Sequence, residues 1–106
     1  MEYLAYFAAG AFLANGIPHF VNGISGNYFQ SPFARPPGVG ESPPFVNVIW
    51  GLLNLVLGIL LVMGVGEFEA GFTPHMLVLG IGFSAMALVL AWHFGRVRNE
   101  NHGDQG

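Results

Sequence analysis

Cysteine is absent from this chain of 106 residues, and charged side chains are scarce. Without cysteine the chain can form no disulfide, no cysteine-ligated zinc site and no iron–sulfur cluster. Charged residues make up 8% of the chain, whereas soluble domains carry about 25%. The three basic residues are too few for a nucleic-acid interface. Hydrophobic residues reach 53%, and this composition predicts one membrane-embedded domain.

Charged residues are also missing from three long stretches, at residues 3–21, 45–66 and 72–94. Each stretch has about the 20 residues that a helix needs to cross the hydrocarbon core of a bilayer. We therefore predict an all-α membrane protein, folded as a single integral membrane domain over residues 1–106. The three predicted transmembrane helices cover about residues 3–22, 43–65 and 73–95. The N-terminal sequence MEY carries no positive charge, so we expect the first stretch to be a membrane helix and not a signal peptide.

Proline and glycine mark the ends of these helices. Ser42-Pro43 and Thr73-Pro74 are typical of an N-cap followed by the first helical residue, and Gly95 is expected to end the third helix. The polar tail over residues 96–106 is then expected to be disordered when the chain is alone.

The few charges predict how the chain crosses the membrane. Arg35 lies in the loop over residues 23–42, and Arg96 and Arg98 follow the third helix. With three crossings these residues share one side, and the acidic residues of the N-terminus and of the second loop share the other. Because cytoplasmic segments are enriched in Lys and Arg, we predict a cytoplasmic first loop and C-terminus and an outer N-terminus, in a bacterial inner membrane.

Polar residues form two matching stripes inside the first and second predicted helices. If these helices form an antiparallel hairpin, each polar residue of one stripe faces one of the other. The predicted pairs are Asn15 with Asn54, His19 with Trp50, and Asn22 with Asn47. Unpaired polar groups in lipid cost several kcal/mol, so the amides are expected to hydrogen-bond across the hairpin and fix its register.

The same residues also fit a functional interpretation. Asn15, His19, Asn54 and His93 could line a polar pocket in the cytoplasmic leaflet, where ionisable residues are functional candidates. His19 and His93 could ligate a haem iron axially, or one of them a chlorophyll magnesium. His75 lies at the opposite membrane face and cannot join them. We prefer the structural interpretation, because His19 is shallow and has partners nearby.

The loop over residues 23–42 is rich in proline and glycine yet contains three aromatic residues. A flexible linker would not need Tyr28, Phe29 and Phe33. Together with Arg35 they predict a docking loop, which rests on the helix ends, on lipid headgroups or on another protein.

No charged residue lies within a predicted helix, and no catalytic constellation is visible, so we expect no enzyme and assign no catalytic or metal-binding residue. The main hypothesis is a non-catalytic accessory subunit of a larger membrane complex, of the respiratory electron-transport or photosynthetic kind. Its partners would be membrane lipids and other membrane subunits, without nucleic acid. One alternative is a subunit that binds haem or chlorophyll through His19 or His93. Another is a small homo-oligomeric channel or transporter.

Overall fold

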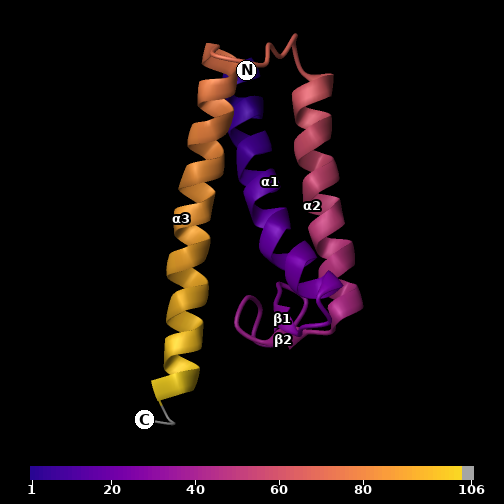
Figure 1. The fold of residues 1–106 in the computed structure, drawn as a ribbon, viewed down its shortest axis with the longest axis vertical. Helices are drawn as coiled ribbons and strands as arrows, with labels where there is room; N and C mark the ends of the chain where they lie inside the picture. The colour runs from indigo at the N-terminus through magenta and orange to yellow at the C-terminus, as the bar shows by residue number, and fades with distance from the viewer. Residues whose placement is uncertain (104–106) are drawn as a thin grey trace.

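The computed structural model describes residues 1–103, and over this range the fold is all-helical apart from one short ribbon. The elements, in chain order, are α1 (Glu2–Ile24), β1 (Phe29–Gln30), β2 (Glu41–Ser42), α2 (Pro44–Gly64) and α3 (Pro74–Gly103) (Figure 1). Three of these, α1, α2 and residues 74–99 of α3, are long and apolar enough to cross a membrane within the described chain. The predicted membrane protein with three candidate transmembrane helices is confirmed at this level.

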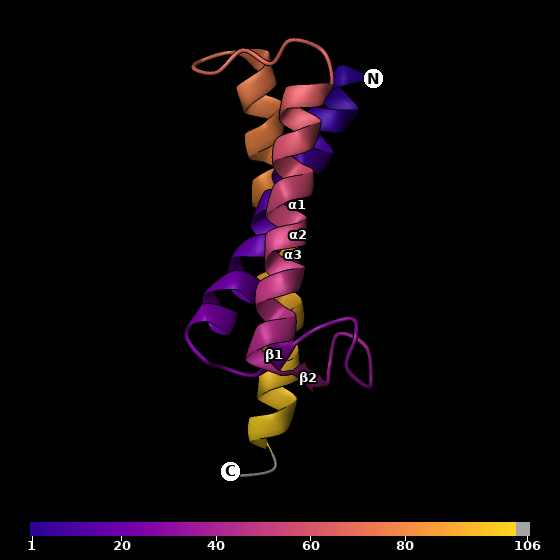
Figure 2. The same ribbon diagram turned by 90° about the vertical axis from the view of Figure 1, so that its right-hand side faces the viewer.

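Helix α1 is the centre of the fold. It packs along both α2 and α3, whereas α2 and α3 make almost no contact with each other over the described residues. Figure 2 shows α1 inclined relative to the other two helices, which run nearly upright. Buried side chains of α1 include Tyr6 and His19, and the buried Asn47 and Asn54 of α2 hydrogen-bond to α1. The outer surfaces of α2 and α3 remain apolar and uncovered.

Glycines allow these close approaches, as small residues do at helix interfaces in membranes. A Cβ added to Gly51 would lie 2.9 Å from the carbonyl oxygen of Gly16, and a Cβ on Gly16 would lie 2.9 Å from that of Gly51. On the other side of α1, Gly10 and Gly82 approach backbone atoms of α3 and α1, respectively, even more closely. Both interfaces of α1 thus bring helix backbones together at glycines.

The loop between α1 and α2 folds back as a ribbon. β1 pairs with β2 in antiparallel fashion, with Phe29 opposite Ser42 and Gln30 opposite Glu41. This pairing uses Ser42, whose Oγ lies 2.6 Å from Ser31 Oγ, so Ser42 does not cap α2. The predicted N-cap is therefore wrong by one position, and α2 begins at Pro44 with Pro43 preceding it.

Helix α3 extends beyond its predicted end. Gly95 was expected to stop it, but the helix continues to Gly103, and residues 104–106 lie outside the described range. Two features stabilise the helix beyond Gly95. Arg96 stacks on the Trp92 ring one turn earlier, 4.7 Å from its centroid, and the side chain of Val97 is buried. The expectation of a disordered tail over residues 96–106 is thus corrected for residues 96–103.

The opposite end of the molecule is held by short-range polar contacts. Thr73 Oγ1 accepts a hydrogen bond from the Met76 N–H at 3.2 Å, which is the N-cap geometry that the sequence predicts. His75 Nδ1 accepts one from the Glu69 N–H at 3.0 Å. His75 thus holds the loop before α3 in place. It lies at the end of the molecule opposite the ribbon, away from His19 and His93, as the sequence predicts.

Candidate functional site

Two amides meet in the middle of the interface between α1 and α2. Asn15 Nδ2 donates to Asn54 Oδ1 at 3.0 Å, and Asn54 Nδ2 donates to the carbonyl oxygen of Trp50, one turn earlier on α2, at 2.8 Å. Asn54 is buried, so both of its amide atoms are satisfied inside the protein. The expected Asn15–Asn54 pair is present.

Of the expected pairs nearer the ribbon, His19 and Trp50 do lie together, with ring centroids 6.4 Å apart, whereas Asn22 and Asn47 do not pair. Asn22 does not face Asn47; its Nδ2 donates at 2.8 Å to the carbonyl oxygen of Pro18 in its own helix. His19 takes the place opposite Asn47, with Nδ1 3.0 Å from Asn47 Oδ1. Asn22 lies in the last turn of α1 and is partly exposed, whereas His19 lies one turn deeper and is 3% exposed. A hydrogen-bond partner in α2 stabilises the buried His19 more than the partly exposed Asn22, because a buried polar group without a partner costs more free energy.

Asn47 joins three parts of the chain. Its Nδ2 donates to the carbonyl oxygens of Phe29 at 3.1 Å and Ser42 at 3.0 Å, which belong to the two strands of the ribbon. Its side chain is fully buried. Because Nδ2 points to two acceptors, Oδ1 must face His19, and the His19 Nδ1 therefore carries the proton as the donor. The Nε2 of a neutral His19 is then an acceptor, and no described residue hydrogen-bonds to it.

Aromatic rings surround His19. Its ring centroid lies 5.4 Å from that of Phe29, 6.4 Å from that of Trp50 and 6.1 Å from that of Phe94, all near edge-to-face. These residues come from β1, α2 and α3, so all three parts of the fold meet around one imidazole. Edge-to-face packing fixes the plane of the His19 ring and hence the direction of its Nε2.

A cavity of about 200 Å³ lies beside His19. Its lining residues are Asn15, His19, Gln30, Ser31, Pro32, Gly38, Trp50, His93 and Phe94. The structure thus brings together Asn15, His19, Trp50 and His93 from the sequence analysis, while Asn54 only contacts Asn15 from outside this lining. None of the lining side chains is acidic or basic apart from the two histidines.

His93 fastens the loop to α3. Its Nε2 lies 2.7 Å from the carbonyl oxygen of Gly38, which can only accept, so Nε2–H is the donor. That nitrogen is therefore engaged by protein. The cavity is also smaller than the roughly 300–1,000 Å³ of typical ligand pockets. These two facts do not favour a tetrapyrrole held inside the cavity between His19 and His93.

Two buried polar atoms at this site have no hydrogen-bond partner among the described residues: Gln30 Oε1 and Trp50 Nε1. Gln30 is 1% exposed, and its Nε2 makes a long contact of 3.4 Å with Glu41 Oε2. Both residues line the cavity. Buried polar atoms are nearly always paired with protein, water or a ligand, so these two atoms are candidates for pairing with ordered water or with a ligand.

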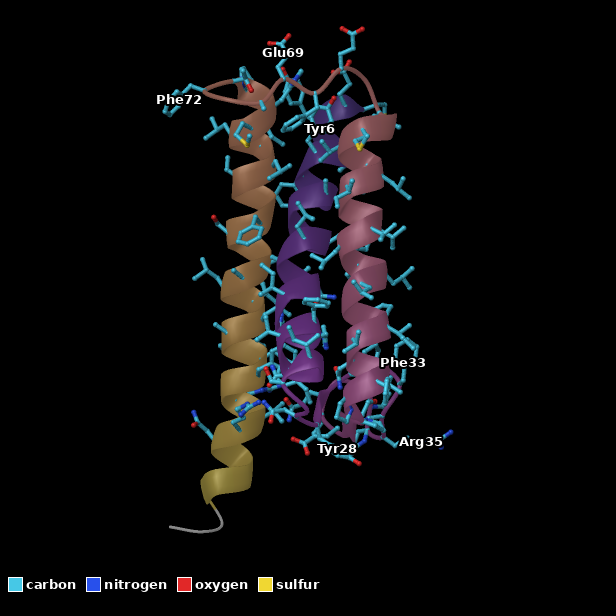
Figure 3. All side chains as sticks on the ribbon, turned by 45° about the vertical axis from the view of Figure 1, so that its right-hand side comes forward. Tyr6, Tyr28, Phe33, Arg35, Glu69 and Phe72 are labelled. Carbon is cyan, nitrogen blue, oxygen red and sulfur yellow. The ribbon has the colours of Figure 1, made fainter. Side chains whose placement is uncertain are left out.

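Some aromatic residues of the predicted docking loop are buried in the protein and others are exposed on its surface. Phe29 is 4% exposed and packs on the protein's own helices, whereas Tyr28 and Phe33 are 59% and 62% exposed. The Phe33 ring contacts the Trp50 ring edge-to-face, with centroids 5.1 Å apart. Figure 3 shows Tyr28, Phe33 and Arg35 at the ribbon end, opposite Glu69 and Phe72.

Gln30, Ser31 and Phe94 also line the cavity, and the sequence did not predict them there. Gln30 and Ser31 lie in a loop whose fold no periodicity predicts, and Phe94 looked like any apolar helix residue. The adjacent polar residues Gln30 and Ser31, directly after Phe29 in a loop rich in glycine and proline, were the available signal. Within the described chain no group of three or more potential metal ligands occurs. No protein-family model, no curated protein and no solved structure matches this chain.

Proposed function

We propose that the protein is a non-catalytic accessory subunit of a larger membrane complex, such as a respiratory or photosynthetic one. In this proposal α1 and α2 cross the membrane as an antiparallel hairpin, the N-terminus lies outside, and the ribbon and the C-terminus lie in the cytoplasm. The observation that carries the proposal is the uncovered outer face of α3.

This face is hollowed over the first half of α3. The hollow, here called the α3 groove, is lined by Gly71, Phe72, Thr73, Pro74, Met76, Leu77, Gly80, Ile81, Ser84, Ala85 and Leu88. A Cβ on Gly80 would meet nothing within 4 Å, and the Ser84 hydroxyl is exposed at mid-helix. Small residues and a hydroxyl in an apolar surface are the features by which transmembrane helices pack together, so the groove suits a helix of another subunit.

The hairpin and its orientation rest on separate observations. The α1–α2 contacts run in opposite chain directions, because Asn15 meets Asn54 while Gly23, further along α1, approaches Pro44 at the start of α2. Arg35 lies at the ribbon end and Glu69 at the other end (Figure 3). The positive-inside bias then favours a cytoplasmic ribbon.

The alternatives have less support. A haem or chlorophyll subunit would need an open histidine nitrogen and room for the macrocycle, and the cavity beside His19 offers little room. A homo-oligomeric channel would need polar groups facing a lumen, but Asn15 and Asn54 satisfy each other within one chain.

Site-specific photo-crosslinking tests the proposal in native membranes. A benzophenone amino acid replaces Ile81, which lines the α3 groove and is 52% exposed, or Ile59 on α2, which is 49% exposed, as a matched control. We expect Ile81 to crosslink to a larger membrane protein and Ile59 to lipid alone. Lipid adducts alone at both positions would refute the proposal, and a dimer of this chain at Ile81 would favour the homo-oligomer.

A further inference from the structure

We propose that the cavity beside His19 binds a small, flat, uncharged ring that bears hydroxyl groups, of the hydroquinone type. The inference rests on the side chains of His19, Gln30 and Trp50 and goes beyond the proposed subunit role, on which it does not depend.

The hydrogen-bonding groups of the cavity define what the ligand must supply. His19 Nε2 is an acceptor, because Nδ1 holds the proton and donates to Asn47. Gln30 Oε1 is a second acceptor and Trp50 Nε1 a donor, and both are buried without a partner among the described residues. A ligand that donates two hydrogen bonds and accepts one complements this set. A ring with two hydroxyl groups does so, because each hydroxyl donates once and also accepts.

The walls and the size narrow the class further. Phe94 and the Trp50 indole line the cavity, and Phe29 backs the His19 ring, so a flat ring finds aromatic surfaces to pack against. The volume of about 200 Å³ suits a single six-membered ring. No acidic, lysine or arginine side chain lines the cavity, and burying an unpaired charge is costly, so the ligand is neutral.

The cavity lies at a depth of the bilayer from which the ligand can enter it. The cavity lies at the ribbon end of the bundle, where α1, α2 and α3 leave the apolar span, and Pro32 and Gly38 of the loop form part of its wall. A ring with hydroxyl groups partitions to this depth of a bilayer, since its face is apolar and its rim is polar. Ordered water is the competing occupant, because it also bridges unpaired polar groups.

The matched probes are hydroquinone, kept reduced under argon, and p-xylene, in which methyl groups replace both hydroxyls at nearly the same shape. The full chain is labelled with ¹⁵N in detergent micelles, and the two indole N–H resonances are followed. The chain has two tryptophans, so Trp92→Phe assigns the Trp50 resonance. Trp92 is 64% exposed on α3 and reports non-specific partitioning in the same spectrum.

Hydroquinone is expected to shift the Trp50 resonance saturably and to leave that of Trp92 unmoved. p-Xylene should bind at least about tenfold more weakly, because it leaves buried polar groups unpaired. Gln30→Met keeps an unbranched side chain but removes the acceptor. It should lower the affinity for hydroquinone about tenfold and leave the affinity for p-xylene unchanged. Retention of the remaining spectrum shows that the variant is folded.

The proposal would be overturned by the absence of a saturable shift at Trp50, which leaves water as the occupant, by equal affinity for both probes, or by parallel, unsaturated shifts at Trp50 and Trp92. A Gln30→Met variant that binds hydroquinone as the parent does would also overturn it. Failure here leaves the crosslinking result on the α3 groove unaffected, so the two proposals fail separately.

Discussion

Replacing Gly82 by alanine tests the contact between α1 and α3, on which the position of the whole third helix depends. A Cβ at Gly82 would overlap the Phe7 carbonyl oxygen and lie 2.8 Å from its carbon, inside the 3.4 Å at which ordinary van der Waals contact begins. The atoms in the way are backbone, so no side chain can rotate to make room. The two helices would have to move apart.

The expected magnitude follows from two opposing effects. Overpacking of a tight interface costs about 1–3 kcal/mol. Alanine is a better helix former than glycine by about 1 kcal/mol, which offsets part of this cost. Gly80→Ala is the matched control, because Gly80 lies on the same helix and has no atom within 4 Å of an added Cβ. The difference between the two variants isolates the steric effect, and we expect it to be about 1–3 kcal/mol.

Unfolding in mixed micelles with increasing SDS measures this difference. Far-UV signals are unsuitable, since the separated helices stay helical. Near-UV circular dichroism of the aromatic cluster is suitable, because Phe94 of α3 packs on Phe29 of the ribbon with ring centroids 4.7 Å apart. We expect the signal of Gly82→Ala to be lost at a lower SDS fraction than that of the parent, and that of Gly80→Ala at an equal or higher one. Equal midpoints for the two variants would show that α3 does not approach α1 at Gly82.

Two further predictions concern the hairpin. A double-mutant cycle with Asn15→Leu and Asn54→Leu should give a coupling free energy of about 0.6–1.7 kcal/mol in the same unfolding assay, and a coupling near zero would mean that this hydrogen bond contributes nothing. Single cysteines at Arg35 and Glu69 are easily interpreted because the chain has none of its own. A membrane-impermeant maleimide added outside intact cells should label the cysteine at position 69 and not that at 35, and the reverse pattern would invert the topology.

The sequence predicted the helices and part of their interface because apolar length and polar spacing are local signals. The α2 residues Asn47 and Asn54 are buried on one face together with Gly51 and Gly58 between and beyond them, as their spacing indicates. The pairing was right for Asn15 and Asn54, where both helices are regular. It was wrong for Asn22, because the partner of Asn47 was chosen by register alone, without the loop that also competes for Asn47.

The loop itself escaped prediction for a physical reason. Each strand has only two residues, too few to show an alternating pattern of polar and apolar side chains. The pairing of Phe29 with Ser42 also encloses a loop whose residues are typical of turns in general and do not indicate one particular fold. The end of α3 was missed because glycine is only a weak stop signal. Tertiary contacts of Arg96 and Val97 outweighed it.

The polar residues that join α1 to α2 also border the cavity beside His19. The hydrogen bond from His19 to Asn47 closes the interface between α1 and α2, and the same bond places the proton on Nδ1 and leaves Nε2 as an acceptor beside the cavity. Asn47 holds this orientation because its other amide atom is fixed by the ribbon carbonyls. The cavity therefore depends on the ribbon being folded. Gln30 and Trp50 border the same cavity, and each keeps one buried polar atom without a partner among the described residues, which is the feature that packing of the helices does not explain.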